Sequence, residues 1–318
     1  MKKEKIELSI VIPCYCASNN IRSVLEEIDK TLKNRKIVYE VILVNDASPD
    51  DTYDVISRLT EERTNIVSID LAKNSGQHAA LMAGFQYAKG NIVATFEDDG
   101  QSEAELLTVM LDKMEEGYDI VTPHYIKRVQ PSLFRRFGSK CERFMEDWMI
   151  EKPNGVYVSI YFMARKFVIE ELCKYDQPYP YISGLILRST SHIASVEGGV
   201  QKGRIGGNSG YNLKKLFSLW VNGFTAFSIK PLRISIVIGA LFAVLGIIGC
   251  IVVVIKKIYG YGVMLGWSSV IAIMLFMFGI VLIVLGMIGE YVGRSYMCIN
   301  KTPQYLIRKV VRSEEEEA

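Results

Sequence analysis

Two long apolar segments near the end of the chain restrict its architecture more than any other feature. They cover residues 234–255 and 267–288, and neither contains a charged residue. A helix that spans a bilayer needs roughly 20 apolar residues, so each segment is long enough to cross one. We interpret the segments as two transmembrane helices. The alternative interpretation is a pair of core helices buried inside a soluble fold.

The distribution of positive charge around these segments predicts their orientation. The connecting loop, residues 256–262, is short, so the pair predicts a hairpin (residues 231–293) that returns the chain to its starting side. Lysines and arginines favour the cytoplasmic face, and they occur before the hairpin at 214, 215, 230 and 233 and after it at 294, 301, 308, 309 and 312. Lys256 and Lys257 in the loop weaken this signal. We therefore expect residues 1–230 and the tail, 294–318, to be cytoplasmic in an integral membrane protein with two spans.

The composition outside the hairpin is that of a soluble domain. The hydrophobic fraction of the whole chain is 49%, and the net charge of +2 gives no indication of nucleic-acid binding. The charged start of the chain and the short apolar run after it do not form a signal peptide. The six cysteines have no paired spacing, and a cytoplasmic domain keeps them reduced, so we interpret them as structural.

Apolar runs and helical patterns alternate along the N-terminal region. Short apolar runs predict strands at residues 8–12, 38–44, 66–71 and 91–96, and helical spacing predicts helices at 21–32, 52–62 and 77–88. This alternation is typical of an α/β domain with a mostly parallel, Rossmann-like sheet covered by helices. We assign residues 1–210 to this domain.

A polar turn follows each predicted strand. Pro13, Asp46 and Asn74 lie in the first three turns, and the acidic cluster Glu97-Asp98-Asp99-Gly100-Gln101 follows the fourth strand. The carboxyl ends of parallel strands meet at one edge of the sheet, where ligands of such folds bind. The four turns are therefore predicted to converge on a single crevice.

The acidic cluster itself has two interpretations. Three consecutive carboxylates cannot be buried without partners, because the desolvation of even one is costly. Hard oxygen ligands at this spacing suit Mg²⁺ or Mn²⁺, which keep coordination positions open for substrate phosphates. The alternative is a solvated acidic turn that leads into a helix beginning near Ser102. The cluster alone does not decide between them.

Several motifs, taken in order, carry a family resemblance. They are residues 9–15 (SIVIPCY), 44–52 (VNDASPDDT), 74–84 (NSGQHAALMAG), 97–101 (EDDGQ), 204–211 (RIGGNSGY) and 289–294 (GEYVGR). The chain resembles the family 2 glycosyltransferases, which have a glycosyltransferase A-type fold. More narrowly, it resembles the membrane-anchored polyprenyl-phosphate glycosyltransferases, relatives of dolichol-phosphate mannose synthase with a C-terminal transmembrane hairpin. The resemblance covers nearly the whole chain.

The resemblance implies a nucleotide-sugar donor, a divalent ion (Mg²⁺ or Mn²⁺) and a lipid phosphate acceptor. It implies donor-binding positions at Pro13, Tyr15, Asp46, Asn74 and His78, catalytic positions at Glu97, Asp98, Asp99 and Gln101, and metal ligands at Asp99, Gln101 and Glu97. Several positions depart from the family pattern, residues 16–18 and Gly210 among them. Glu97 replaces the first aspartate of its motif, Asn45 replaces a common acid, and Ala47 replaces a glycine, which should cost little if φ there is negative.

The acceptor determines which other groups the reaction needs. A lipid monophosphate is already anionic at pH 7, so its enzyme needs cations rather than a general base. Residues 131–148 combine apolar positions at helical spacing with arginines, which can bind phosphate bidentately. The predicted acceptor and phosphate contacts are Arg128, Arg135, Ser139, Arg204 and Ser209. The alternative for this stretch is an ordinary amphipathic helix with a solvated basic face.

A second amphipathic stretch, residues 211–230, precedes the hairpin. Its lysines and aromatic residues are typical of a helix that lies in the membrane interface, and a core helix is the alternative. Taken together, these features predict an inverting transfer of one sugar from a UDP-sugar such as UDP-glucose to polyprenyl phosphate in the bacterial plasma membrane. No nucleic acid is expected as a partner, and a homo-oligomer is left open. A processive polysaccharide synthase and a non-catalytic membrane scaffold are the alternative functions.

Overall fold

The protein is described here from a computed structural model of the 318-residue chain. The described residues are 5–100, 102–128, 156–157, 159–178, 180–201 and 266–312, with single positions between 239 and 259. Several predictions lie outside these residues. They concern Gln101, Arg135, Ser139, Arg204, Ser209, the two amphipathic stretches (131–148 and 211–230) and most of the first apolar segment.

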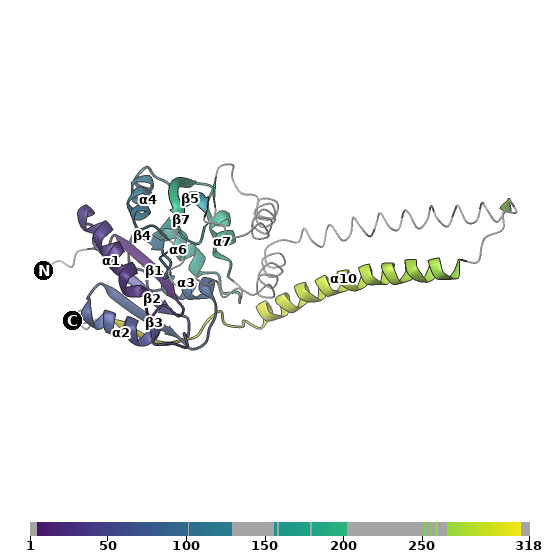
Figure 1. Cartoon of the computed structure of the whole chain (residues 1–318), viewed down its shortest axis with the longest axis horizontal. Helices are drawn as coiled ribbons and strands as arrows, with labels where there is room; N and C mark the ends of the chain where they lie inside the picture. The colour runs from purple at the N-terminus through teal and green to yellow at the C-terminus, as the bar shows by residue number, and fades with distance from the viewer. Residues whose placement is uncertain are drawn as a thin grey trace. The chain divides into compact units, whose positions relative to one another are not determined.

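The N-terminal domain is built on one eight-stranded sheet (Figure 1). Its strands are β1 (Leu8–Cys14), β2 (Tyr39–Asn45), β3 (Ile66–Leu71), β4 (Ile92–Thr95), β5 (Ile120–Arg128), β6 (Met163–Arg165), β7 (Ile193–Gln201) and β8 (Ile307–Arg312). The spatial order is β7-β5-β6-β4-β1-β2-β3-β8. Strands β4, β1, β2 and β3 are mutually parallel, and β5 is parallel to β7. The predicted mostly parallel α/β sheet is therefore confirmed.

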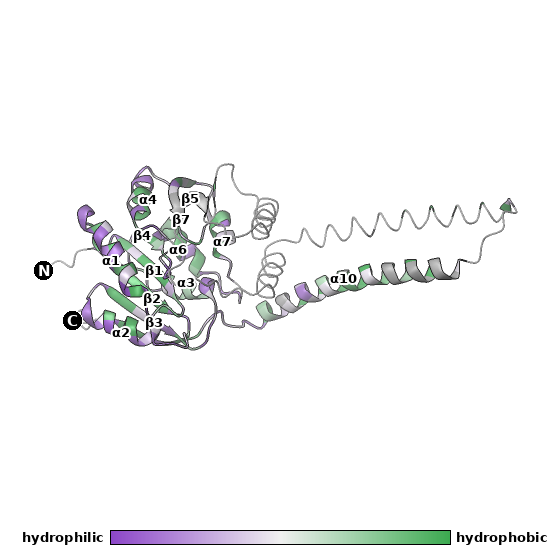
Figure 2. Ribbon diagram, in the orientation of Figure 1, coloured by the Kyte–Doolittle hydropathy of each residue, from purple (hydrophilic) through white to green (hydrophobic). Residues whose placement is uncertain are grey.

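Helices cover both faces of this sheet. They are α1 (Ile21–Leu32), the short 3₁₀ helix η1 (Lys33–Arg35), α2 (Thr52–Glu62), α3 (Gln77–Phe85), α4 (Glu105–Glu115), α6 (Lys166–Cys173) and α7 (Ile182–Ser189). Side chains of α1, α2 and α4 belong to one buried cluster, and side chains of α3, α6 and α7 belong to the other. The purple and green residues of α1 and α2 in Figure 2 show why these helices bury one side only.

The alternation of side chains along β1 connects the two clusters. Ile10 and Ile12 face the α1 and α4 side, whereas Val11 between them faces α3. All seven residues of β1 are buried, as expected for a central strand covered on both faces. Helix α3 packs directly on this strand, because a Cβ at Gly84 would lie 2.3 Å from Val11 Cγ1. A larger residue at position 84 would push α3 away from the sheet.

The element boundaries differ from the predictions at β1, β2, α3, α4 and β4, and β2 covers Tyr39–Asn45 rather than residues 38–44. Strand β1 does not stop at Pro13 but continues to Cys14, because β2 pairs with it as far as Asn45. Helix α3 ends at Phe85 rather than at residue 88, and α4 begins at Glu105 rather than near Ser102. Strand β4 is shorter than the predicted run at residues 91–96.

The antiparallel strands of the sheet were not predicted from the sequence. Strand β6 lies between β4 and β5 and is antiparallel to both. Strand β8, which follows the hairpin in the chain, adds to the edge of the sheet antiparallel to β3. The C-terminal segment therefore belongs to the same compact unit as the N-terminal domain.

The second compact unit, residues 213–300, contains the long helix α10 (Trp267–Ile299). Among the described residues, one stretch of helix is long and apolar enough to cross a membrane, Met277–Ile299, with a mean hydropathy of 1.6. Helix α10 begins where the second apolar segment was predicted to begin and continues past residue 288 through six residues that the sequence had assigned to the tail.

Candidate active site

Four turns meet at the carboxyl edge of the parallel strands, as the sequence predicted. Side-chain hydrogen bonds join the turn after β1 to the turn after β4, and the turn after β2 to the turn after β3. Register explains why these turns are neighbours, because Cys14 pairs with Asn45 and Asn45 pairs with Asp70 at the ends of β1, β2 and β3.

Asp46 organises the turn that follows β3. Its Oδ1 accepts a hydrogen bond from Ser75 N–H at 2.6 Å, and its Oδ2 accepts one from Gly76 N–H at 2.8 Å. Gly76 has φ of +88°, a conformation that glycine adopts without strain and that turns its N–H toward the carboxylate. Burial raises the pKa of Asp46 above its ordinary value, although these two donors act in the opposite direction. A donor base that also bonds to Asp46 would use a remaining lone pair.

Asp98 joins the acidic turn to the turn after β1. Its Oδ2 accepts a hydrogen bond from Tyr15 N–H at 2.9 Å. Tyr15 is 49% exposed at this edge. Pro13, by contrast, is buried within β1, and Asn74 is exposed in the turn after β3.

The other residues of the acidic turn are neighbours of Asp98 in the sequence. Asp99 is buried, with 8% of its surface exposed, and Gly100 has φ of +71°, which only glycine adopts readily. Ser102 Oγ donates a hydrogen bond to Glu97 Oε2 at 2.7 Å. Burial, together with the nearby Glu97 charge, raises the pKa of Tyr125 to about 12, so this phenol stays protonated at neutral pH.

These carboxylates suit a hard divalent cation. Within the part of the chain that the structure describes, no group of three or more His, Cys, Asp or Glu residues is arranged to hold a metal ion. Mg²⁺ and related ions are commonly held by one or two carboxylates together with substrate phosphates and water. Asp99 and Glu97 stay the predicted ligands of an ion that the substrate would complete, and Gln101 lies outside the described residues.

His78 occupies the first turn of α3. Its Nδ1 accepts a hydrogen bond from Ile182 N–H, the first residue of α7, at 3.4 Å, and its ring meets the Tyr181 ring edge-on with centroids 5.5 Å apart. The surrounding packing lowers the pKa of His78 to about 4. The imidazole is therefore neutral at pH 7, with its proton on Nε2, which is the atom that could face a donor.

Sequence reasoning did not find a polar network on the β2 and β3 side of the site. Asn45 Nδ2 donates to Asp70 Oδ1 at 2.8 Å, and Asn45 Oδ1 accepts from Ser48 N–H at 3.2 Å. Asp70 also pairs with Arg308 of β8 at 3.1 Å. The β-branched residues Ile307, Val310 and Val311 could have indicated a strand, but the sequence contains no local signal for its partner.

The condition under which Ala47 should cost little, a negative φ, is not met. Its φ is +49°, in the left-handed region, so a side chain there is strained. The turn after β2 must reverse direction between Asn45 and Ser48, and this geometry explains why the resembled family uses glycine at the position.

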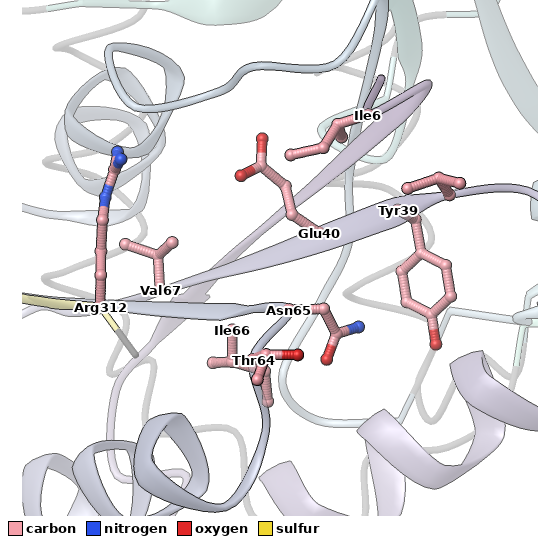
Figure 3. Close-up of a pocket in the computed structure, with 9 residues that line it drawn as sticks. Ile6, Tyr39, Glu40, Thr64, Asn65, Ile66, Val67 and Arg312 are labelled. Carbon is pink, nitrogen blue, oxygen red and sulfur yellow. The ribbon is translucent and has the colours of Figure 1, made fainter. Parts of the chain in front are cut away.

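A cavity of about 160 Å³ lies at the opposite edge of the sheet, where the parallel strands begin (Figure 3). Glu40, Tyr39 and Arg312 are among the residues that line it, and Glu40 Oε1 accepts hydrogen bonds from Ser9 Oγ and Lys89 N–H. Ligands of parallel sheets bind at the carboxyl edge. We therefore assign this cavity no part in the site, and interpret Glu40 as a structural acceptor.

Relatives with curated names match almost the whole chain. A protein of Bacillus subtilis named uncharacterized glycosyltransferase YkcC is 30% identical over 96% of this chain and 94% of its own length. Undecaprenyl-phosphate 4-deoxy-4-formamido-L-arabinose transferase from Proteus mirabilis is 32% identical over 97% of this chain and 95% of its own length. The enzyme of the same name from Yersinia enterocolitica is 31% identical over 99% and 97%.

The fold also matches a solved glycosyltransferase structure. Glucosyl-3-phosphoglycerate synthase from Mycobacterium tuberculosis, in complex with Mn²⁺, UDP-glucose and phosphoglyceric acid, aligns with a TM-score of 0.51 over 69% of this chain and 77% of that chain. Its sequence identity is 17%, so this likeness concerns the fold alone.

Two family models match separate parts of the chain. Glycosyl transferase family 2 matches residues 9–173, which include all four turns of the site, and the GtrB C-terminal hairpin matches residues 230–295. The second match corresponds to the predicted membrane hairpin and supports its membrane anchorage. The chain therefore belongs to glycosyl transferase family 2, as a glycosyltransferase with a GtrB C-terminal hairpin.

Proposed function

We propose that this protein transfers one monosaccharide from a nucleotide sugar, a UDP-sugar such as UDP-glucose, to polyprenyl phosphate at the cytoplasmic face of a bacterial plasma membrane. The transfer depends on Mg²⁺ or Mn²⁺ and inverts the anomeric centre. The observation that carries the proposal is the convergence of the acidic turn with Tyr15 and with the Asp46-bound turn at one edge of the sheet.

The relatives support the acceptor part of the proposal. The Proteus and Yersinia enzymes are named for transfer to undecaprenyl phosphate, and they match this chain over nearly its full length. A lipid acceptor also explains why a glycosyltransferase would carry a membrane hairpin, because the long chain of a polyprenyl phosphate keeps its phosphate at the membrane surface.

The acidic turn supports the donor part. Asp99 and Glu97, with Gln101, would hold the divalent ion beside the donor diphosphate. When bound, such an ion stabilises the negative charge that develops on the leaving diphosphate. The exposed Tyr15 ring offers a surface for the base, and the N–H groups of the Ser75–Gly76 turn are fixed by Asp46 at the same edge.

The pairing of β8 with β3 supports the two-span topology. Residues before and after the hairpin belong to the same sheet, so both must lie on the same side of any membrane that the chain crosses. An even number of crossings between them is therefore required. Helix α10 supplies one candidate crossing, and the apolar segment at 234–255 is long enough to supply the other. The flanking positive charges favour the cytoplasm for the shared side.

The chemistry of the acceptor supports a single displacement. A phosphate monoester attacks as an anion, so no general base has to remove a proton from it. Inversion follows when the phosphate oxygen bonds to the anomeric carbon while the nucleotide diphosphate leaves from the opposite face. An α-linked donor would then give a β-linked lipid phosphate.

The decisive experiment is an assay of the purified full-length protein in detergent. A panel of UDP- and GDP-sugars is incubated with polyprenyl phosphate and Mg²⁺ or Mn²⁺, and the lipid product is characterised by mass spectrometry and NMR. We expect one sugar per lipid with an inverted anomeric configuration. A retained configuration would contradict the single displacement, a product with several sugars would support a processive synthase, and no product from any donor would support a scaffold.

The acceptor contacts have a test of their own. Arg128 ends β5, and Arg135 follows it in the basic stretch. If both bind the lipid phosphate, replacing either with Ala should raise the KM for polyprenyl phosphate much more than the KM for the donor. Lys113→Ala, which removes a positive charge from α4 where it pairs with Glu116, is the control. Equal changes in both KM values would contradict the assignment.

A further inference from the structure

Arg308, which follows the predicted membrane hairpin in the chain, contacts the buried Asp70 at the end of β3. Arg308 Nη1 lies 3.1 Å from Asp70 Oδ2, and Arg308 Nη2 donates to the Ala72 carbonyl at 3.1 Å. The backbone holds the same junction, because Ala72 N–H donates to the Leu306 carbonyl at 2.8 Å. The guanidinium is thus fixed at the end of β3 by two contacts of its own and by the pairing of β8.

The acid that Arg308 contacts would be costly without a cation. The Asp70 side chain is only 5% exposed, whereas that of Arg308 is 61% exposed. A buried carboxylate loses its hydration, and a charge-assisted hydrogen bond from arginine offsets much of this loss. Arg308 therefore offsets much of the desolvation of Asp70 while its own charge stays in contact with water.

Asp70 in turn fixes the orientation of Asn45. Asp70 Oδ1 accepts a hydrogen bond from Asn45 Nδ2 at 2.8 Å, which leaves Asn45 Oδ1 facing the other way, where it accepts Ser48 N–H. Ser48 Oγ then accepts a hydrogen bond from Cys16 N–H at 3.1 Å. A carboxylate accepts but does not donate, so only one orientation of the Asn45 amide satisfies both neighbours.

We propose that Arg308 is a positioning residue for the donor site and acts through Asp70 and Asn45 on the turn formed by residues 45–48. Asp46, which accepts the hydrogen bonds of the Ser75–Gly76 turn, lies inside this segment. Tyr15 is the residue before Cys16, whose N–H donates to Ser48 Oγ. The strand that follows the membrane anchor therefore sets the geometry of the nucleotide-binding edge. The inference rests on the proposed donor site at that edge.

The network also accounts for one departure from the family pattern. The resembled family often has an acid where this chain has Asn45. An acid there would place a second carboxylate against Asp70, within the 2.8 Å that now separates the Asn45 amide from Asp70 Oδ1. Two carboxylates at such a distance cannot both stay ionised. Asn45, Asp70 and Arg308 are thus matched in charge, and a change in one should alter the effect of changing another.

The experiment measures binding of UDP and of GDP, each with Mn²⁺, to the full-length protein in detergent. Arg308→Ala should weaken binding of the nucleotide that the wild type prefers by about tenfold, the size expected for loss of one charge-assisted hydrogen bond at a partly exposed site. Arg308→Lys should recover part of the loss. Lys309→Ala removes the same charge from the neighbouring, exposed position of β8 and should leave binding unchanged.

A double-mutant cycle separates positioning from general stability. In an Asp70→Asn background, Arg308→Ala should have little further effect on nucleotide affinity, because the charge it compensates is already gone. Equal losses with Arg308→Ala and Lys309→Ala, or unchanged affinity with Arg308→Ala in a folded protein, would overturn the proposal.

The rate of amide hydrogen exchange at residues 46–52 measures how well ordered the turn is in the ligand-free protein. We expect faster exchange there in Arg308→Ala than in Lys309→Ala. Unchanged exchange would overturn the inference even if nucleotides bind. Failure of the wild type to bind either nucleotide, with exchange altered as expected, would instead contradict the proposed donor site.

Discussion

The two sides of the site are built in different ways. On the β2 and β3 side, two acids each hold a neighbouring segment: Asp46 accepts two backbone N–H groups, and Asp70 accepts hydrogen bonds from both Asn45 and Arg308. On the β4 side, three carboxylates follow one another in the sequence, and Asp99 among them is buried. The first arrangement spreads negative charge among donors, whereas the second concentrates it.

The difference indicates which residues serve folding and which serve chemistry. Acids that hold backbone groups stabilise the native turns, so their loss should lower stability as well as ligand binding. Clustered like charges destabilise a fold, and such an arrangement is expected where function requires it. We therefore expect neutralisation of Asp99 to remove activity without loss of stability, whereas Asp98 holds the Tyr15 N–H and its neutralisation should also lower stability.

Asp99→Asn should have the largest effect. Loss of one preorganised electrostatic contact typically lowers kcat by about 100- to 1000-fold, and we expect an effect of this size in transferase assays with Mg²⁺ or Mn²⁺. The thermal unfolding midpoint should stay the same or rise. Glu97→Gln should be milder, because Glu97 also bonds Ser102. Turnover near the wild-type value in Asp99→Asn would remove Asp99 from the site.

Asp46→Asn should lower both stability and donor affinity. The amide retains one acceptor oxygen, so one of the two N–H groups of the Ser75–Gly76 turn loses its partner. We expect the free energy of unfolding to fall by about 2–3 kcal/mol, with at least a tenfold weaker donor affinity, as for loss of a charge-assisted hydrogen bond. Asp51→Asn, at an exposed position of the same turn region, is the control. Unchanged stability in Asp46→Asn would break the comparison.

The β2 and β3 side also shows what the sequence could predict. Helix α2 and strand β3 have the boundaries expected from hydrophobic spacing, and Asp46 lies at the predicted edge, because period and turn chemistry are local properties. The convergence of the four turns followed from the parallel sheet alone. The hydrogen-bond partners of Asp46 did not, since they depend on the left-handed conformation of Gly76.

Contacts between distant segments explain most of what was missed. Asp70 and Arg308 are separated by 238 positions, and strand β8 becomes a strand by pairing with β3. A short segment of mixed apolar and basic residues does not specify which edge it joins. His78 was predicted as a donor contact, and the structure adds a partner for it, Ile182 at the start of α7, that no local pattern indicates. Its role toward the donor stays a prediction.

His78 should make the stability of the fold depend on pH. The pKa of His78 is about 4 in the folded protein, whereas the ordinary pKa of a solvated histidine is 6.5. Between these two values the unfolded chain binds a proton at His78 and the folded chain does not. Stability should therefore fall as the pH drops from about 6.5 to about 4, by about 2 kcal/mol at pH 5, and change little through this group below that range.

The variant His78→Gln tests this dependence. Glutamine can still accept the Ile182 N–H but does not titrate. Between pH 8 and pH 5, denaturant unfolding should therefore shift in favour of the variant by about 2 kcal/mol relative to the wild type. His192→Gln, at an exposed histidine, is the matched control. Parallel pH profiles for His78→Gln and the wild type would show that His78 is not the sensitive group.

Ala47→Gly should produce the smallest change in stability of the variants considered. It tests whether stability and donor affinity can be separated within the turn after β2. Ala47 has φ of +49°, and a left-handed conformation costs a residue with a side chain roughly 1–2 kcal/mol. Glycine removes this strain but loses more entropy on folding, a cost of about 0.4–1 kcal/mol. We therefore expect a net stabilisation of about 0.5 kcal/mol in denaturant unfolding. Because the turn keeps its Asp46 contacts, donor affinity should not change. A destabilised variant would mean that the turn does not hold residue 47 in the left-handed region, and would also weaken the case for the Asn45 network that flanks it.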